Sequence, residues 1–191
     1  MAGELGYSGR RWSVNTLTLD FGEPTTAPQH YSGLFNPPDL DAAYDAWKCT
    51  CGPGSVAALL GLTCEAVRPH FPGHEQRGYA NPTHVQNALR SLGYRVTSDW
   101  VKPDHKPYQP AFGLVFVQFG GPWLAPGVPV GAAYRKTHWS AINGAMAYDV
   151  NAEGGWWRVS DWAEEVLPYI AKAIKRCDGT FYVRASFEVT P

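Results

Sequence analysis

Residues 51–60 have the sequence Cys-Gly-Pro-Gly-Ser-Val-Ala-Ala-Leu-Leu, and this stretch decides the predicted fold. Proline suits the first turn of a helix, where its missing N–H costs no hydrogen bond, so Pro53 predicts a helix that Ser55 to Leu60 continue. Cys51 then lies at or just before the helix N-terminus, the positive end of the helix dipole. A helix N-terminus and a nearby imidazolium favour the thiolate form of a cysteine, which attacks carbonyl groups. The stretch therefore predicts a nucleophilic cysteine.

Two other interpretations of Cys51 compete with this one. Most unpaired cysteines are small buried hydrophobes, and Cys49 offers a second thiol only two residues upstream. The pair can also form half of a zinc site, but no second closely spaced pair follows, because Cys64 and Cys177 are isolated. We therefore expect no metal in the protein.

A histidine 87 residues further along the chain is the candidate base. His138 lies in the segment 131–142, whose β-branched and aromatic residues are typical of a strand. Asn143-Gly144 follows and predicts a hairpin turn, with 145–151 as the return strand. A lone histidine on a strand is more often a structural residue than a catalyst. Assigning His138 a catalytic role therefore needs a further reason from the hairpin.

That reason is the group that can orient the imidazole ring. An antiparallel hairpin can bring Asn151 back near His138, where the side-chain amide can fix the ring. Asn151 can also be a plain turn residue, and Asp149 or Asp161 can be the orienting group instead.

A largely helical half is expected before a half made of strands. The expected helices are 51–60, a short segment after residue 63, one from 81–82 to a stop at 93, and one over about 162–175 capped by Asp161; the expected strands are 95–100, 113–119, 130–142, 145–151, 156–160 and 181–189. Helices grouped before a mainly antiparallel sheet indicate an α+β protein. In this arrangement the helical half carries the cysteine and packs on the sheet that carries the histidine.

One domain is expected over residues 41–191, because 191 residues with 45% hydrophobic content can form one substantial core. Residues 1–40 are expected to form an N-terminal edge strand over 11–20 and a Pro/Gly-rich arm over 21–40. The segment 101–112 contains three prolines and is expected to be an exposed loop that can border a substrate groove.

Charge and hydropathy exclude several classes of function. The net charge is -1 and no long basic tract occurs, so we expect no nucleic acid and no anionic membrane as a partner. The chain also lacks a signal peptide and a run of about 18 to 20 apolar residues, so a cytoplasmic protein is expected. The four cysteines are then expected to be free thiols.

These motifs carry a resemblance to papain-like cysteine peptidases. Cys-Gly-Pro at 51–53 resembles the peptidase domains of bacteriocin-processing transporters. His-Trp at 138–139 and Tyr-Asp-Val-Asn at 148–151 resemble elements of Josephin-type deubiquitinases. Together with 78–83 and 121–123, the arrangement is similar to small proteins of tailed phages and prophages.

The resemblance covers about residues 44–170 and implies a papain-like fold, because the order Cys, His, Asn is that of this superfamily. It implies a hydrolase, a peptidase or isopeptidase, that cleaves a protein or peptide through a thioester acyl-enzyme and needs no cofactor. Cys51 would be the nucleophile, His138 the base and later the acid, and Asn151 the orienting residue. The alternative is an inactive papain-like fold that serves as a phage structural or host-interaction protein, in the host cytoplasm or in the virion.

The chain departs from the papain-like pattern at one place. Such enzymes usually carry a glutamine five or six residues before the nucleophile, and its amide donates to the oxyanion. Here Ala46 and Asp45 occupy those positions, and neither is a suitable donor. Backbone amides, the Trp47 N–H or Gln118 are the candidate replacements, although Trp47 can equally be a core aromatic.

Overall fold

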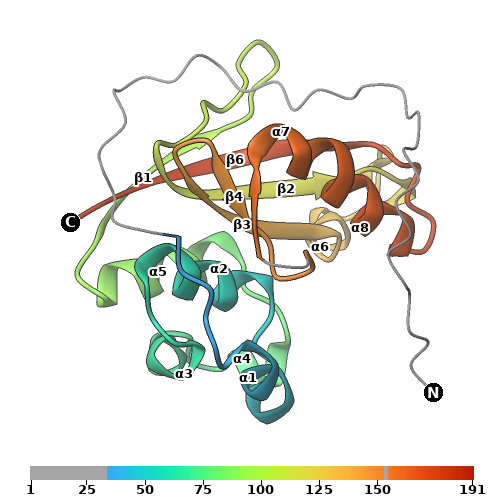
Figure 1. Ribbon diagram of the computed structural model, residues 1–191. Helices are drawn as coiled ribbons and strands as arrows, with labels where there is room; N and C mark the ends of the chain where they lie inside the picture. The colour runs from blue at the N-terminus through green and yellow to red at the C-terminus, as the bar shows by residue number, and fades with distance from the viewer. Residues whose placement is uncertain (1–33, 153–154) are drawn as a thin grey trace.

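The computed structural model describes residues 34–152 and 155–191 (Figure 1). The predicted edge strand at 11–20 lies outside the described residues, as does the predicted arm up to residue 33. Across the described part, helices precede most of the strands, and the α+β class is confirmed.

The described strands form one six-stranded sheet in which each neighbouring pair is antiparallel, in the order β1-β6-β2-β3-β4-β5. The strands are β1 (Arg95–Trp100), β2 (Phe112–Phe119), β3 (Thr137–Asn143), β4 (Met146–Tyr148), β5 (Trp156–Arg158) and β6 (Phe181–Thr190). The C-terminal strand β6 lies between β1 and β2, so it pairs on both sides with strands from earlier in the chain.

Helices cover both faces of this sheet (Figure 1). The helical segments are α1 (Leu40–Trp47), α2 (Cys51–Leu60), α3 (Cys64–Val67), η1 (Arg68–His70), α4 (His74–Arg77), α5 (Pro82–Ser91), η2 (Pro122–Leu124), α6 (Val130–Tyr134), α7 (Val159–Asp161), η3 (Trp162–Val166) and α8 (Leu167–Ala173). In Figure 1, α2 and α5 lie on one side of the sheet and α7 and α8 on the other.

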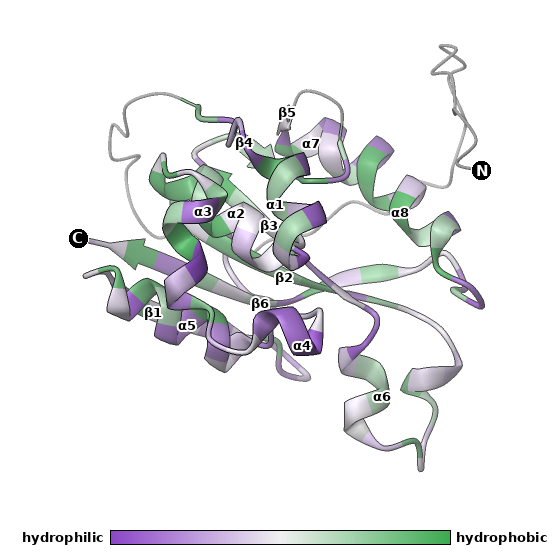
Figure 2. Ribbon diagram, turned by 90° about the horizontal axis from the view of Figure 1, so that it is seen from below, coloured by the Kyte–Doolittle hydropathy of each residue, from purple (hydrophilic) through white to green (hydrophobic). Residues whose placement is uncertain are grey.

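The central strand β2 is buried along its whole length and divides the core in two. Because successive strand side chains point to opposite faces, Leu114 and Phe116 pack in the cluster that includes α2. Val115 and Val117 pack instead in the cluster that includes α8. In Figure 2 the outer helix α5 shows both hydrophobic and hydrophilic segments, as expected of a helix with one buried face.

The strand β3 starts later than predicted, so that prediction was wrong. Residues 130–142 were expected to form one strand, but Val130–Tyr134 form the short helix α6 and the strand begins only at Thr137. The paired alanines inside α6 are strong helix formers, and Pro129 occupies the position just before the helix.

The C-terminal helical segment also differs from its predicted form. It begins at Val159, runs through a π-helical turn and ends at Ala173, so Asp161 lies inside it and caps nothing. The buried positions Trp162 and Val166 lie one turn apart, and this apolar spacing carries the helix across the point where a cap was expected. The helices α1 and α4 were not predicted from the sequence.

Candidate active site

Helix α2 holds Cys51 at its first position, preceded by the extended residue Thr50. The hydroxyl of Ser55, one turn further along, is fully buried and donates to the backbone oxygen of Trp139 at 3.1 Å. The start of α2 is thereby fixed to the strand β3 directly beside His138.

Two glycines allow this close approach of α2 to its neighbours. A Cβ atom on Gly52 would lie 2.6 Å from the Cβ of Ala80, and one on Gly54 would lie 2.7 Å from Val150 Cγ1. Real Cβ atoms almost never approach other carbons so closely, since cores are packed at crystal density. The glycines of the Cys-Gly-Pro-Gly motif thus let the nucleophile's helix turn lie directly against the chain around it.

Gly52→Ala is expected to lower the free energy of unfolding by about 1–3 kcal/mol, because the added methyl group must displace a short, rigid neighbour. This loss exceeds the gain of about 1 kcal/mol that alanine brings to a helix. The control is Gly131→Ala in α6, where a Cβ meets nothing within 4 Å. Urea denaturation of both variants measures the effect. Equal stability of the two would contradict the packing argument.

The turn before Cys51 is braced by a buried histidine. Lys48 ends α1 in the left-handed conformation, with φ 61°. The Nε2 of His74 lies 3.0 Å from the Lys48 backbone oxygen and 3.3 Å from Thr50 Oγ1. Burial lowers the pKa of His74, which keeps the ring neutral and in a state to donate to the carbonyl.

His138 forms the second half of the site near the start of β3. It is 4% exposed, and its Nε2 lies 2.7 Å from Asp149 Oδ2. Because a carboxylate only accepts, Nε2 donates in this bond. The Cys51 side chain is among the groups that raise the pKa of this ring. Since Nε2 is bound to Asp149, Nδ1 is the nitrogen that can take the Cys51 proton.

The carboxylate of Asp149 is fully buried and surrounded by donors. Oδ2 accepts from Trp162 Nε1 at 2.8 Å and from Ser140 Oγ at 3.1 Å, in addition to His138. Oδ1 accepts from the backbone N–H of Asn151 at 2.9 Å and from its side-chain amide at 3.4 Å. A buried charge needs such bonds to remain ionised, and here every donor also fixes the direction of the carboxylate.

The two partners shift each other's pKa. Burial alone would lower the pKa of His138, but the charge of Asp149, the neighbouring Cys51 and the hydrogen bond to Asp149 raise it to about 10. Burial alone would raise the pKa of Asp149, but the charge of His138 and the bonds from His138, Trp162 and Asn151 lower it below its ordinary value. The site therefore favours an imidazolium beside a carboxylate at neutral pH.

The four cysteines, all free thiols, differ in their surroundings. Cys49 and Cys64 are buried, and the hydrogen bond to Cys64 together with burial raises the pKa of Cys49. Cys51 and Cys177 are partly exposed. Of these two, Cys51 interacts with an imidazole, whereas Cys177 accepts from the Gly179 N–H at 3.4 Å.

Asn151, predicted as the orienting residue, makes its hydrogen bonds to Asp149. The strand β4 ends at Tyr148, and the chain then turns, with the Ala152 N–H donating to the Asp149 backbone oxygen at 3.1 Å. Asn151 therefore lies in a turn and not opposite His138 in the ladder. Asp149, one of the alternatives, is the residue in contact with the ring.

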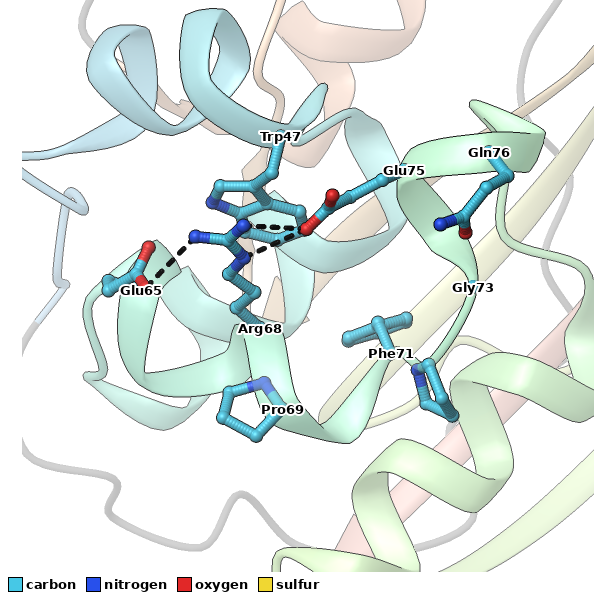
Figure 3. Close-up of a pocket in the computed structure, with 9 residues that line it drawn as sticks. Trp47, Glu65, Arg68, Pro69, Phe71, Gly73, Glu75 and Gln76 are labelled. Atoms are coloured by element: carbon cyan, nitrogen blue, oxygen red, sulfur yellow. Dashed lines mark hydrogen bonds and ion pairs between the residues drawn. The ribbon is translucent and has the colours of Figure 1, made fainter.

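Gln118 and Trp47, the candidate oxyanion donors, take other roles. The buried amide of Gln118 donates to the backbone oxygens of Phe119, Ala133 and Lys136 at 3.0–3.1 Å. Trp47 lines a pocket of ≈ 360 Å³ in which Arg68 lies over its ring and pairs with two glutamates (Figure 3). Its indole N–H is buried and has no partner among the described residues.

Three residues of the site were not predicted from the sequence: Ser140, Trp162 and Ser55. The sequence spacing could have indicated Ser140, because it lies two residues after His138 on the same strand and therefore on the same face of the sheet. Trp162 and Ser55 come from distant elements, and only the packing of those elements reveals their contacts.

The comparisons with known proteins add no relative: no protein-family model matches the chain, and searches of curated proteins and of solved structures give no significant match. Within residues 34–152 and 155–191, no helix has the length and apolarity that a membrane span requires. The same residues contain no group of three or more His, Cys, Asp or Glu side chains placed to hold a metal ion.

Proposed function

We propose that the protein is a papain-like cysteine hydrolase, a peptidase or isopeptidase that acts on a protein or peptide substrate. One observation carries this proposal. Cys51, partly exposed at the start of α2, lies on a helix that Ser55 joins to β3 beside His138, and the buried His138 ring donates from Nε2 to the buried carboxylate of Asp149. A nucleophile, a base and a group that orients the base are the three parts that such catalysis needs.

In the proposed resting state the Cys51 proton already lies on Nδ1 of His138, so that a thiolate faces an imidazolium. The thiolate attacks the substrate carbonyl, the C–N bond breaks, and the imidazolium gives its proton to the leaving amine. Water then attacks the resulting thioester, with His138 taking its proton, and the acid is released. Asp149 keeps the ring in one orientation and stabilises its positive charge throughout.

Backbone amides supply the proposed oxyanion contacts. The first N–H groups of a helix have no intrahelical acceptor, and Cys51 and Gly52 hold those positions in α2. These two N–H groups lie at the helix N-terminus, where the helix dipole also favours negative charge. The exposed side chains of Asp45 and Ala46 are then not required as donors.

A limiting dose of iodoacetamide on the folded protein tests the proposal. Burial alone protects Cys49 and Cys64, so the informative comparison is between Cys51 and Cys177. An ordinary thiol is only a few per cent ionised at neutral pH, so a thiolate paired with an imidazolium is expected to react about tenfold faster. Peptide mass mapping of the labelled cysteines gives both rates in one sample.

His138→Ala is expected to reduce the Cys51 rate to that of Cys177, which serves as the internal reference in the same chain. Circular dichroism of the variant confirms that it is folded. Equal rates for Cys51 and Cys177 in the unaltered protein would refute the hydrolase proposal and favour the alternative, a non-catalytic papain-like fold with a phage structural or host-interaction role.

A further inference from the structure

A groove with a volume of ≈ 970 Å³ opens beside the candidate active site. One wall comes from the segment 79–83 at the start of α5, and the other from 129–136, which includes α6. In Figure 2, α6 lies apart from the other helices, away from the centre of the sheet. The loop 101–112, expected to border a groove, contributes none of its lining.

Both walls are directly connected to the reactive pair. Lys136 lines the groove two residues before His138 on the same stretch of chain. Ala80, between two lining residues of the other wall, packs against Gly52 and accepts from the Trp139 indole at 2.8 Å. A peptide in the groove would therefore lie along the two segments that adjoin Cys51 and His138.

The wall that contains α6 is held in place by buried contacts. Gln118 is fully buried, and its amide bonds the backbone at both ends of the turn, at Ala133 and Lys136. Its side-chain oxygen accepts from Arg184 at 2.8 Å, and the Arg184 guanidinium lies 4.4 Å from the centroid of the Tyr134 ring. These contacts hold the outer wall of the groove in a fixed position.

The chemistry of the lining is aromatic and basic. It includes four aromatic residues, of which Tyr79 is 53% exposed, and the two cations Arg135 and Lys136. No aspartate or glutamate occurs among the lining residues that the structure describes, and neither cation forms an ion pair with a described residue. The Lys136 ammonium lies 5.7 Å from the centroid of the Trp123 ring.

We propose that this groove binds an extended substrate segment in which acidic side chains adjoin an aromatic one. The inference rests on the proposed function, since a peptide is the substrate of the adjacent nucleophile. The carboxylates would pair with Arg135 and Lys136, and the aromatic side chain would stack among Tyr79, Trp123 and Tyr134. The site thereby selects acidic sequences near the cleaved bond.

Fluorescence anisotropy with the Cys51→Ala protein tests binding without any chemistry. The probe is a fluorescein-labelled peptide Gly-Ala-Phe-Glu-Glu-Phe-Ala-Gly, compared with the same peptide carrying lysine in place of both glutamates. The acidic peptide is expected to bind at least about tenfold more tightly, and less so at high salt. Arg135→Glu with Lys136→Glu is expected to abolish that preference, whereas Arg90→Glu, outside the lining, is not.

Three results would overturn the proposal: equal binding of both peptides, an unchanged preference in the double variant, or tighter binding of a labelled ten-residue oligothymidylate than of the acidic peptide. The last result would indicate a single-stranded nucleic acid in the groove. Cys51 labelling is measured separately from peptide binding. If Cys51 is not labelled selectively but the acidic peptide is still preferred, the hydrolase proposal alone is refuted. Selective labelling without peptide preference would refute the groove alone.

Discussion

Asp149→Asn is expected to slow the labelling of Cys51 by iodoacetamide about tenfold, to the rate of an ordinary thiol such as Cys177. The variant removes the negative charge that keeps the buried ring of His138 protonated. An uncharged amide removes the largest of the influences that raise the pKa of the ring, and the burial that remains favours the neutral form. Without an imidazolium, the Cys51 thiolate loses its partner.

NMR titration of the His138 ring gives a direct measure of this effect. In the unaltered protein the ring is expected to stay protonated up to about pH 10, and in Asp149→Asn to be neutral at pH 7. The matched control is Asp161→Asn, which removes a nearby carboxylate whose described hydrogen bond comes only from Ser160. A His138 titration that is the same in both variants would refute the assigned role of Asp149.

The same pair fixes the pH dependence of stability. Because folding raises the pKa of His138 above its ordinary 6.5, its contribution is complete below pH 6.5 and is lost as the pH rises toward 10. The lowered pKa of Asp149 gives a contribution that is present above 3.8 and is lost as the pH falls. Urea denaturation at about pH 6 and about pH 9.5 should show a larger loss for the unaltered protein than for Asp149→Asn.

Trp162→Ala is expected to lower the free energy of unfolding by about 3–5 kcal/mol, because it removes a fully buried indole from the core between η3 and the sheet. Trp162→Phe separates packing from hydrogen bonding. It keeps most of the ring but deprives Asp149 of a donor at 2.8 Å, which should cost about 1.5–3 kcal/mol and slow Cys51 labelling.

Trp123→Phe is the matched control for the stability measurement. It also removes an indole donor at 2.8 Å, but the acceptor is the neutral backbone oxygen of Phe119 and the site is partly exposed. Its expected cost is about 0.5–1.5 kcal/mol in urea denaturation. A cost for Trp162→Phe no larger than this would contradict the view that the indole stabilises a buried charge.

The hairpin that carries the base shows how far local sequence can predict the site. Asn143-Gly144 predicted the turn, and β3 and β4 pair across it with Asn143 opposite Met146. Continuing that ladder would place Asn151 opposite His138, and this is why the asparagine was expected to hold the ring. The strand stops at Tyr148 because the next residues close a turn, and a local pattern does not show where a ladder ends.

Other parts of the site depend on contacts between distant segments. The start of α2 was predicted from Cys-Gly-Pro, since capping and proline placement are local effects. The role of Gln118, by contrast, follows from backbone oxygens of a helix whose sequence had suggested a strand. Trp162 reaches Asp149 from a helix on the opposite face of the sheet to α2, and no spacing in the sequence encodes that contact.

The bond from the Ser55 hydroxyl to the Trp139 backbone joins two separate layers, and it lies next to both reactive groups. The thiol and the imidazole meet only while those layers are docked. The enhanced reactivity of Cys51 therefore reports whether the helical layer and the sheet are packed together. In a denaturant titration, this enhancement should disappear at the midpoint at which the two layers separate.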